Sequence, residues 1–231
     1  MLRRVALAAM APLLLFACGP SASVDPAQQL KDAATALKGV KTVQLDFKFG
    51  AGATISLSGV SVDLVTATGK VRLPSDSDLV GRVKQGDNIV QAEIVTLGGD
   101  TYIKPVSFLP ASKLSAEEAA QYPNAARLMD PDKGLPSVIA NGKSPSVTGA
   151  ESVDGHDSYK VDATYSPDDL KSALAPFTPA DQVKVTFWIA KDDHLVRKAL
   201  ISGHIFSASS DSSIEVHLHD FNASVDITAP G

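Results

Sequence analysis

Alternation of apolar and polar residues recurs along most of the chain and predicts strands with one covered and one solvated face. In VQLDFKF, residues 43–49, the apolar side chains fall on one side and the polar side chains on the other. Further strands are predicted at residues 55–64, 69–73, 88–97, 98–105, 156–165, 183–190, 195–203 and 212–221. Residues 191–194, KDDH, are predicted to be a hairpin connection. Strands this numerous, joined by turns, indicate a large antiparallel sheet.

A helical pattern precedes the strands. Asp25 is a predicted N-cap and Pro26 suits the first helical position, so a helix is expected from Pro26 to Lys38, with Gly39 as its C-cap. Its predicted apolar face consists of Leu30, Ala33, Ala34 and Leu37.

Further helices are predicted between the strands of the second half. Residues 115–122 and 124–130 have helical patterns, and Asp130 followed by Pro131 predicts another helix that stops at residues 141–142. Ser166 is a predicted N-cap of a last helix, whose apolar side chains are Leu170, Leu174 and Phe177. Because each element has one apolar side to bury, the helices should cover the apolar sheet face. The predicted fold class is α+β, a curved antiparallel sheet wrapped around several helices.

The N-terminal residues are typical of a secretory signal. Two arginines precede an apolar run, residues 5–16, which is shorter than the roughly 20 residues needed to span a bilayer. The run ends in Leu15-Phe16-Ala17-Cys18, which resembles a bacterial lipobox, where the cysteine is acylated and the chain is cut before it. A reactive thiol or a catalytic nucleophile are the competing interpretations of Cys18, and neither explains its place beside the apolar run. We expect a signal peptide at 1–17, a lipidated cysteine and tether at 18–24, and a single domain at 25–231.

Charge narrows the possible partners. The net charge is −5, and removal of residues 1–17 takes away two arginines and no acid, which leaves −7. An acidic chain argues against nucleic acid or an anionic surface as a charge-driven partner. With one cysteine in the chain, no internal disulfide can form.

Residues that carry chemistry are scattered and form no recognised motif. His217 and His219 share one strand face and suggest a metal site, but a solvated strand face is the better interpretation. The segment Asp192-Asp193-His194 resembles a triad only in composition, and Asp130 and Asp132 are better explained by helix capping. We therefore expect no catalytic residue, no metal and no cofactor.

The apolar positions leave the interior undecided between a filled core and a cavity. The candidate inward side chains are mostly aliphatic and of middle size, aromatic residues make up 6% of the chain, and alanine is frequent in the predicted helices. These residues alone favour a filled core.

Several further segments follow the lipobox in a distinctive order and spacing. They are ALKGVKTVQLDF, LVTATGKVRL, VQAEIVTLGGDTYIK, LMDPDKGLPSVIANG, VTGAESVDGHDSYKVDAT and VKVTFWIAKDDHLVRKALISG. Together they extend over nearly the whole chain after Cys18, and in this order and spacing they resemble the LppX/LprG-type lipoproteins of actinobacterial cell envelopes.

The resemblance implies a half-barrel of antiparallel strands similar to the carriers LolA and LolB, with an apolar cavity between sheet and helices. It implies a membrane-anchored lipoprotein that binds acyl chains of lipids, glycolipids or lipoglycans and carries them across the cell envelope, without catalysis. Cavity positions expected from it are Phe47, Val71, Ile94, Thr96, Leu135, Val138, Ile139, Leu174 and Phe187.

The expected location is the outer face of the bacterial cytoplasmic membrane, with the anchor on Cys18. The expected partners are this membrane, a lipid or glycolipid cargo and an envelope lipid exporter, but no nucleic acid. The alternative is a non-carrying interaction lipoprotein that is accessory to an exporter.

Overall fold

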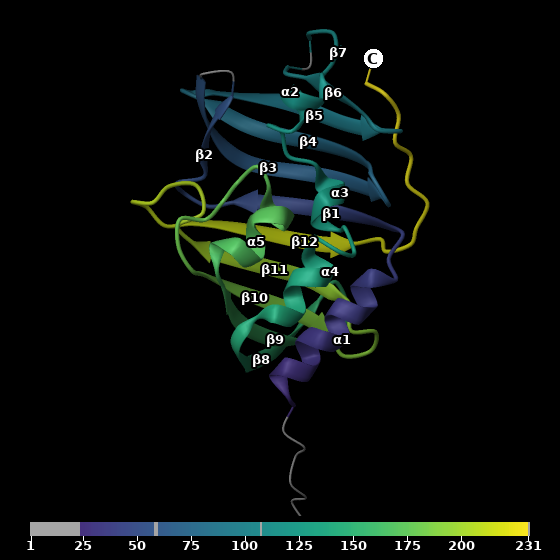
Figure 1. The fold of residues 1–231 in the computed structure, drawn as a ribbon, viewed down its shortest axis with the longest axis vertical. Coiled ribbons are helices and arrows are strands. Elements are labelled where there is room, and N and C mark those ends of the chain that lie inside the picture. Colours follow the sequence, from purple (N-terminus) through teal and green to yellow (C-terminus); the bar gives the residue numbers. More distant parts are fainter. Residues whose placement is uncertain (1–23, 58–59, 107, 231) are drawn as a thin grey trace, which may run out of the picture.

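A single twelve-stranded antiparallel sheet dominates the computed structural model, which describes residues 24–57, 60–106 and 108–230 (Figure 1). The strands are β1 (Thr42–Phe49), β2 (Thr54–Leu57), β3 (Val60–Arg72), β4 (Asp76–Gln85), β5 (Asn88–Leu97), β6 (Asp100–Lys104), β7 (Ser112–Lys113), β8 (Lys143–Val153), β9 (His156–Tyr165), β10 (Val183–Ala190), β11 (Val196–Gly203) and β12 (Ser212–His219). Their order is β7-β6-β5-β4-β3-β1-β12-β11-β10-β9-β8, and β2 pairs with β3 off this path. The sheet is open, with β7 and β8 at its two edges.

The helices lie together on one face of the sheet (Figure 1). They are α1 (Pro26–Lys38), α2 (Ala116–Ala119), α3 (Ala125–Leu128), α4 (Leu135–Val138), the 3-10 turn η1 (Ile139–Asn141) and α5 (Pro167–Leu174). The predicted fold class, a curved antiparallel sheet wrapped around several helices, is confirmed. Among the described residues, no helix is long and apolar enough to cross a membrane.

The first helix has the predicted bounds and caps. The Asp25 carboxylate accepts N–H bonds from Ala27 and Gln28, and the backbone N–H of Gly39 bonds back to the last turn. The buried side chains are Leu30, Ala33, Ala34 and Leu37, the predicted face. Burial of each leucine is worth about 1.5–3 kcal/mol. Packing therefore holds α1 on the sheet more strongly than the Asp25 cap, which contributes about 1 kcal/mol.

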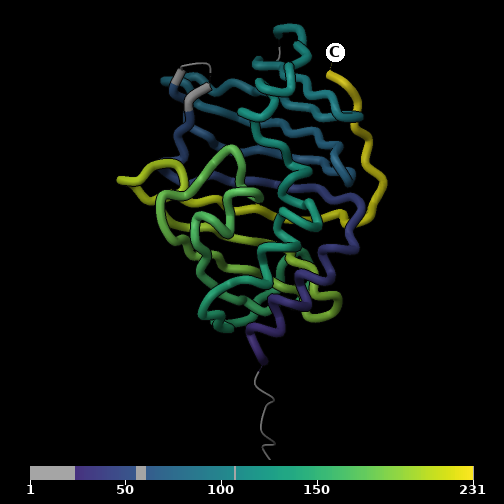
Figure 2. Tube along the Cα trace, in the orientation of Figure 1, coloured from purple at the N-terminus to yellow at the C-terminus, as the bar shows by residue number. Residues whose placement is uncertain are grey.

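One half of the molecule is filled. Helix α1 contacts α4, η1, β8 and β9, and Figure 2 shows the purple α1 against the later, green strands. Under these helices Tyr165 packs edge-to-face against Phe187, with ring centroids 6.1 Å apart. The Tyr165 hydroxyl donates a 2.8 Å hydrogen bond to the carbonyl of Ile139, and burial raises the pKa of this hydroxyl. The phenol is thus a permanent donor that joins β9 to η1.

The structure departs from the predicted elements where the pattern is weak. Strand β4 and most of β8 were not expected from alternation, and residues 60–72 form one strand rather than two. Helices α2 and α3 are shorter than predicted. The helix expected from Asp130 begins only at Leu135, because the Asp130 carboxylate caps a tight turn through the N–H groups of Asp132 and Lys133.

Candidate functional site

A cavity of about 150 Å³ lies between the inner sheet face and helices α3 and α5. It occupies the half of the molecule that α1 and α4 leave uncovered. Its walls come from β1 to β5, β11, β12, α3, α5 and the segments beside these helices. The lining residues are Phe47, Phe49, Ile55, Leu64, Thr66, Ala67, Leu79, Gly81, Val83, Ala92, Ile94, Pro123, Asn124, Ala125, Leu128, Ala173, Leu174, Ala175, Phe177, Ile201, Ile214 and Val216.

The cavity wall is almost wholly apolar. No charged residue lines it, and its polar side chains are those of Thr66 and Asn124. The Asn124 amide is already engaged, because its oxygen accepts from Ser77 and from the N–H of Ala126, and its nitrogen lies 3.4 Å from Thr96 Oγ1. A charged or strongly polar ligand group would lose its hydration here without gaining partners. The wall suits hydrocarbon.

Small residues explain why this half of the sheet remains hollow. Ala67, Gly81 and Ala92 occupy inward positions on three neighbouring strands, and they leave space that larger side chains would fill. A Cβ on Gly81 would meet only the carbonyl oxygen of Ala92, at 4.0 Å. Gly69 has a different role, since a Cβ there would meet the Cβ of Ala125 at 3.6 Å and α3 therefore sits close to the sheet.

The cavity reaches the ends of the strands where β1 passes into β2. Phe49, Ile55 and Leu64 line it at this end and remain half-buried. We call this the mouth end. Phe206, in the connection between β11 and β12, packs edge-on against both Phe49 and Phe177, with ring centroids 6.3 Å and 5.1 Å apart. Aromatic rings thus border the cavity beside its mouth end.

The nine predicted cavity positions divide between the two halves of the molecule. Phe47, Ile94 and Leu174 line the cavity. The other six do not, and lie buried in the packing around it, namely Val71, Thr96, Leu135, Val138, Ile139 and Phe187. Alternation shows which face of a strand points inward, but it does not show whether a helix covers that position. Sequence reasoning missed Gly81 and Ala92, whose only signal is small size at an inward position.

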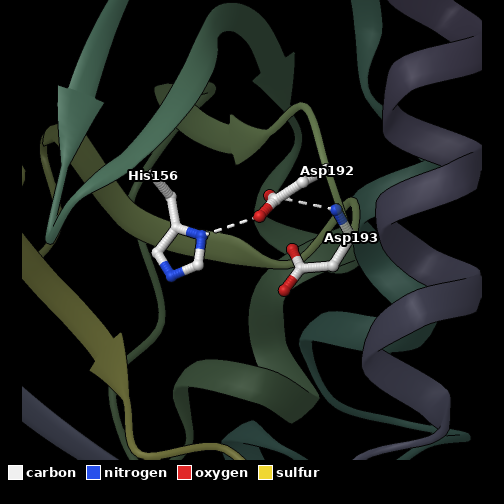
Figure 3. Close-up of side chains that lie close together, drawn as sticks. All are labelled: His156, Asp192 and Asp193. Atoms are coloured by element: carbon white, nitrogen blue, oxygen red, sulfur yellow. Dashed lines mark hydrogen bonds and ion pairs between the residues drawn. The ribbon is translucent and has the colours of Figure 1, made fainter.

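The predicted hairpin between β10 and β11 carries a polar cluster rather than a triad (Figure 3). His156 Nδ1 lies 3.0 Å from the Asp192 carboxylate, and this hydrogen bond holds the pKa of Asp192 below its usual range. Asp193 pairs with the buried guanidinium of Arg197. In the described part of the chain, His156, Asp192 and Asp193 are the one group of three possible metal ligands. The Arg197 cation beside them opposes metal binding, so an internal ion-pair cluster explains them better.

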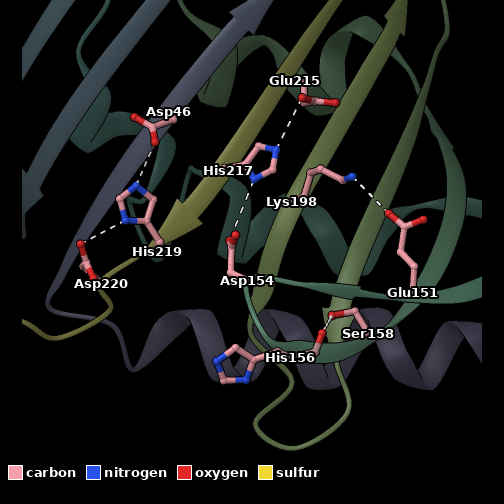
Figure 4. Close-up of polar contacts among 10 residues, drawn as sticks. All are labelled: Asp46, Glu151, Asp154, His156, Ser158, Lys198, Glu215, His217, His219 and Asp220. Atoms are coloured by element: carbon pink, nitrogen blue, oxygen red, sulfur yellow. Dashed lines mark hydrogen bonds and ion pairs between the residues drawn. The ribbon is translucent and has the colours of Figure 1, made fainter.

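The two histidines of β12 face separate partners on the outer sheet surface (Figure 4). His219 lies 3.1 Å from both Asp46 and Asp220, whereas His217 lies between Asp154, at 4.0 Å, and Glu215, at 3.5 Å. Beside them Lys198 pairs with Glu151. The arrangement fits the solvated strand face preferred from the sequence. Cys18, the expected lipidation site, lies outside the described residues.

Comparison with known proteins gives the same fold. The crystal structure of LprF from Mycobacterium bovis aligns with a TM-score of 0.69 at 18% identity, over 89% of this chain and 96% of that one. LppX from Mycobacterium tuberculosis aligns with a TM-score of 0.60 at 20% identity, over 89% of this chain and all of that one. Identities this low show similarity of fold alone.

The chain spans less than two thirds of the length of the first sequence relatives that it matches. The chain is 30% identical over 146 residues to a protein named lipoarabinomannan carrier protein LprG from Mycolicibacterium smegmatis. That match covers 63% of this chain and 58% of the relative. The sequence model of the LppX_LprAFG lipoproteins matches residues 25–227, which include every described helix and strand. The chain therefore belongs to the LppX_LprAFG lipoprotein family.

Proposed function

We propose that this protein is a lipid carrier that shelters acyl chains in the cavity between β1–β5 and helices α3 and α5. The observation that carries the proposal is an apolar, uncharged cavity between sheet and helices in one half of the interior, while packed side chains fill the other half. Each methylene removed from water contributes about 0.8 kcal/mol. A dry pocket therefore lowers the cost of moving a lipid through an aqueous compartment, while the polar headgroup stays at the mouth end.

The size of the cavity sets a condition for loading. At about 150 Å³ it is smaller than typical ligand pockets, which measure about 300–1,000 Å³. Helix α5 has eight residues and α3 has four, so this part of the helical layer is thin. We propose that the layer yields outward when a long acyl chain enters.

The proposed cargo is a glycolipid, a lipoglycan or another acylated envelope lipid. Relatives named lipoarabinomannan carrier proteins support this class. Anchoring is also part of the proposal, with acylated Cys18 holding the domain at the outer face of the cytoplasmic membrane through residues 19–24. Attachment of more than one acyl chain makes such an anchor stable. The proposed activity is transport towards the outer envelope, with handover to a lipid exporter, and no catalysis.

An accessory lipoprotein without cargo is the other candidate. It would need a filled core and an apolar interaction patch. The apolar cavity argues for the carrier over the accessory lipoprotein.

The test is uptake of a fluorescent fatty acid by the mature chain, residues 18–231 with Cys18→Ser. All described helices and strands lie within this chain. Ile94→Trp places a large ring in the cavity and should abolish uptake. Gln91→Trp is the matched control, because position 91 lies on the same strand, is exposed and does not line the cavity. Equal uptake by folded Ile94→Trp and Gln91→Trp would reject the cavity as the binding site.

A further inference from the structure

Three large apolar side chains are exposed in the described part of the chain, one at the start of β5 and two in the connection between β6 and β7. They are Ile89 at 51% exposure, Phe108 at 83% and Leu109 at 44%. Lys104, the last residue of β6, pairs with Glu93, four residues from Ile89 along β5, so β6 ends while running towards the end of the sheet where β5 begins. We call these three residues the rim patch. Single exposed apolar residues are ordinary on a surface, but two exposed neighbours such as Phe108 and Leu109 indicate contact with something apolar.

The rim patch lies towards the mouth end of the strands. Lys48 pairs with Thr66 and Asp63 pairs with Lys84, so β1 and β4 both end while running towards the start of β3. The β4–β5 turn follows at this end, and β6 runs towards it but stops four residues of β5 short of Ile89. Apolar side chains inside the cavity and exposed apolar side chains outside it therefore share one end of the sheet.

We propose that the rim patch inserts into the surface of a phospholipid bilayer and brings the cavity mouth to the membrane. The proposal rests on the proposed carrier function, since an acyl chain could then pass from bilayer to cavity with little exposure to water. Leu109 donates its N–H to the Val106 carbonyl at 3.0 Å, and Phe108 is 83% exposed. An exposed aromatic side chain beside an exposed leucine suits shallow insertion.

The size and charge of the patch favour a bilayer over a protein partner. A buried aromatic side chain covers about 150–250 Å². Three side chains therefore fall short of the roughly 800 Å² per partner of a stable protein interface. Around Ile89, the exposed cations Arg82 and Lys84 are balanced by the exposed Asp63 and Asp87. Attachment should thus depend on apolar burial, with little effect of salt.

The position of the anchor agrees with this orientation. Helix α1 begins at the opposite end of the long axis from β6 and β7 (Figure 1). Seven residues, 19–25, lie between Cys18 and Pro26, and the eight steps from Cα to Cα reach at most about 29 Å. Anchor and rim patch can therefore share one bilayer when the long axis lies along the membrane. Tethering also raises the local concentration, so that weak insertion suffices.

The experiment measures binding of mature Cys18→Ser chain to phosphatidylcholine vesicles, with and without phosphatidylglycerol. The double variant Phe108→Ser/Leu109→Ser should bind the vesicles at least about tenfold more weakly than the parent, because it loses the apolar groups that enter the bilayer. Lys31→Ser, an exposed change on α1, is the control and should bind as the parent does. Equal binding of the double variant and its parent, or no binding by either, would overturn the proposal.

A second variant reports insertion directly. The chain has one tryptophan, Trp188, which is buried between Lys160 and Lys198. Phe108→Trp should be quenched by vesicles with brominated acyl chains, whereas Trp188 of the parent should not. Absence of quenching, or self-association that Phe108→Ser removes, would overturn the bilayer assignment. Fatty-acid uptake from solution separates the two proposals. The double variant should still take up fatty acid, because its cavity is intact. A parent protein that takes up no fatty acid would reject the carrier function, whatever its binding to vesicles.

Discussion

Filling the cavity from Gly81 is the sharpest perturbation that the structure offers. The inner face of β4 presents Leu79, Gly81 and Val83 to the cavity, and a Cβ at position 81 meets nothing closer than 4.0 Å. Gly81→Leu should therefore enter without backbone strain. It places four carbon atoms into a space of about 150 Å³.

The expected effects on folding and binding have opposite signs. Burial of the new side chain, together with the removal of a flexible glycine from a strand, should raise the free energy of unfolding by about 2 kcal/mol. The melting temperature should rise by about 4–8 °C. The four carbons displace about four methylenes of an acyl chain, and at about 0.8 kcal/mol each the affinity should fall by about 100-fold or more.

The assay is thermal unfolding combined with titration of a fluorescent fatty acid. Gly149→Leu is the matched control, because position 149 lies on the edge strand β8, also has open space around its Cβ and is remote from the cavity. It should bind the fatty acid as the parent does. A stabilised Gly81→Leu variant with unchanged affinity would refute the assignment of acyl chains to this cavity.

Two further predictions concern stability. Tyr165→Phe removes the shorter of two hydrogen bonds to the Ile139 carbonyl, which keeps the N–H of Gly142 at 3.4 Å. The free energy of unfolding, measured in urea, should fall by about 0.5–1.5 kcal/mol while fatty-acid affinity stays unchanged. The N–H of Gly98 and the Arg72 guanidinium hold the pKa of Asp76 below its usual range. The ionised Asp76 carboxylate therefore contributes its full stabilisation above about pH 4, and this stabilisation is lost as the pH falls through the lowered native pKa. On acidification from pH 5, the free energy of unfolding should fall less in Asp76→Asn than in the parent. An identical acid dependence would contradict this role.

Elements with strong local signals were predictable from the sequence. The caps Asp25 and Ser166, each followed by proline, place the starts of α1 and α5 correctly. Strands β9 and β10 have the predicted bounds, because β-branched and aromatic residues recur along them. In these segments local propensity and burial act in the same direction.

The cavity wall escaped prediction for a physical reason. Strand β4 presents Ser77 and Gly81 at inward positions, which interrupts the apolar alternation by which a strand is recognised. A wall that leaves space for a ligand carries small residues where a packed strand carries large ones. The feature that makes β4 part of the candidate site thus also removes its signal as a strand.

Helix placement is the other information that the sequence pattern lacks. Val71 and Phe187 were expected at the cavity, yet both are buried in the packed core. Phe47 and Ile94 lie on similarly alternating strands and line the cavity, since α1 and α4 cover the other half. Only tertiary contacts distinguish a filled part of the interior from a hollow one.

Mass spectrometry of an organic extract tests the carrier proposal most directly. The mature Cys18→Ser chain, without any covalent lipid, would be exposed to bacterial membranes, purified and extracted, with Gly81→Leu treated in parallel. We predict a glycolipid or another acylated lipid in stoichiometric amount from the parent and little or none from Gly81→Leu. A folded parent protein that yields no lipid, and takes up none when lipid is added, would contradict the proposal.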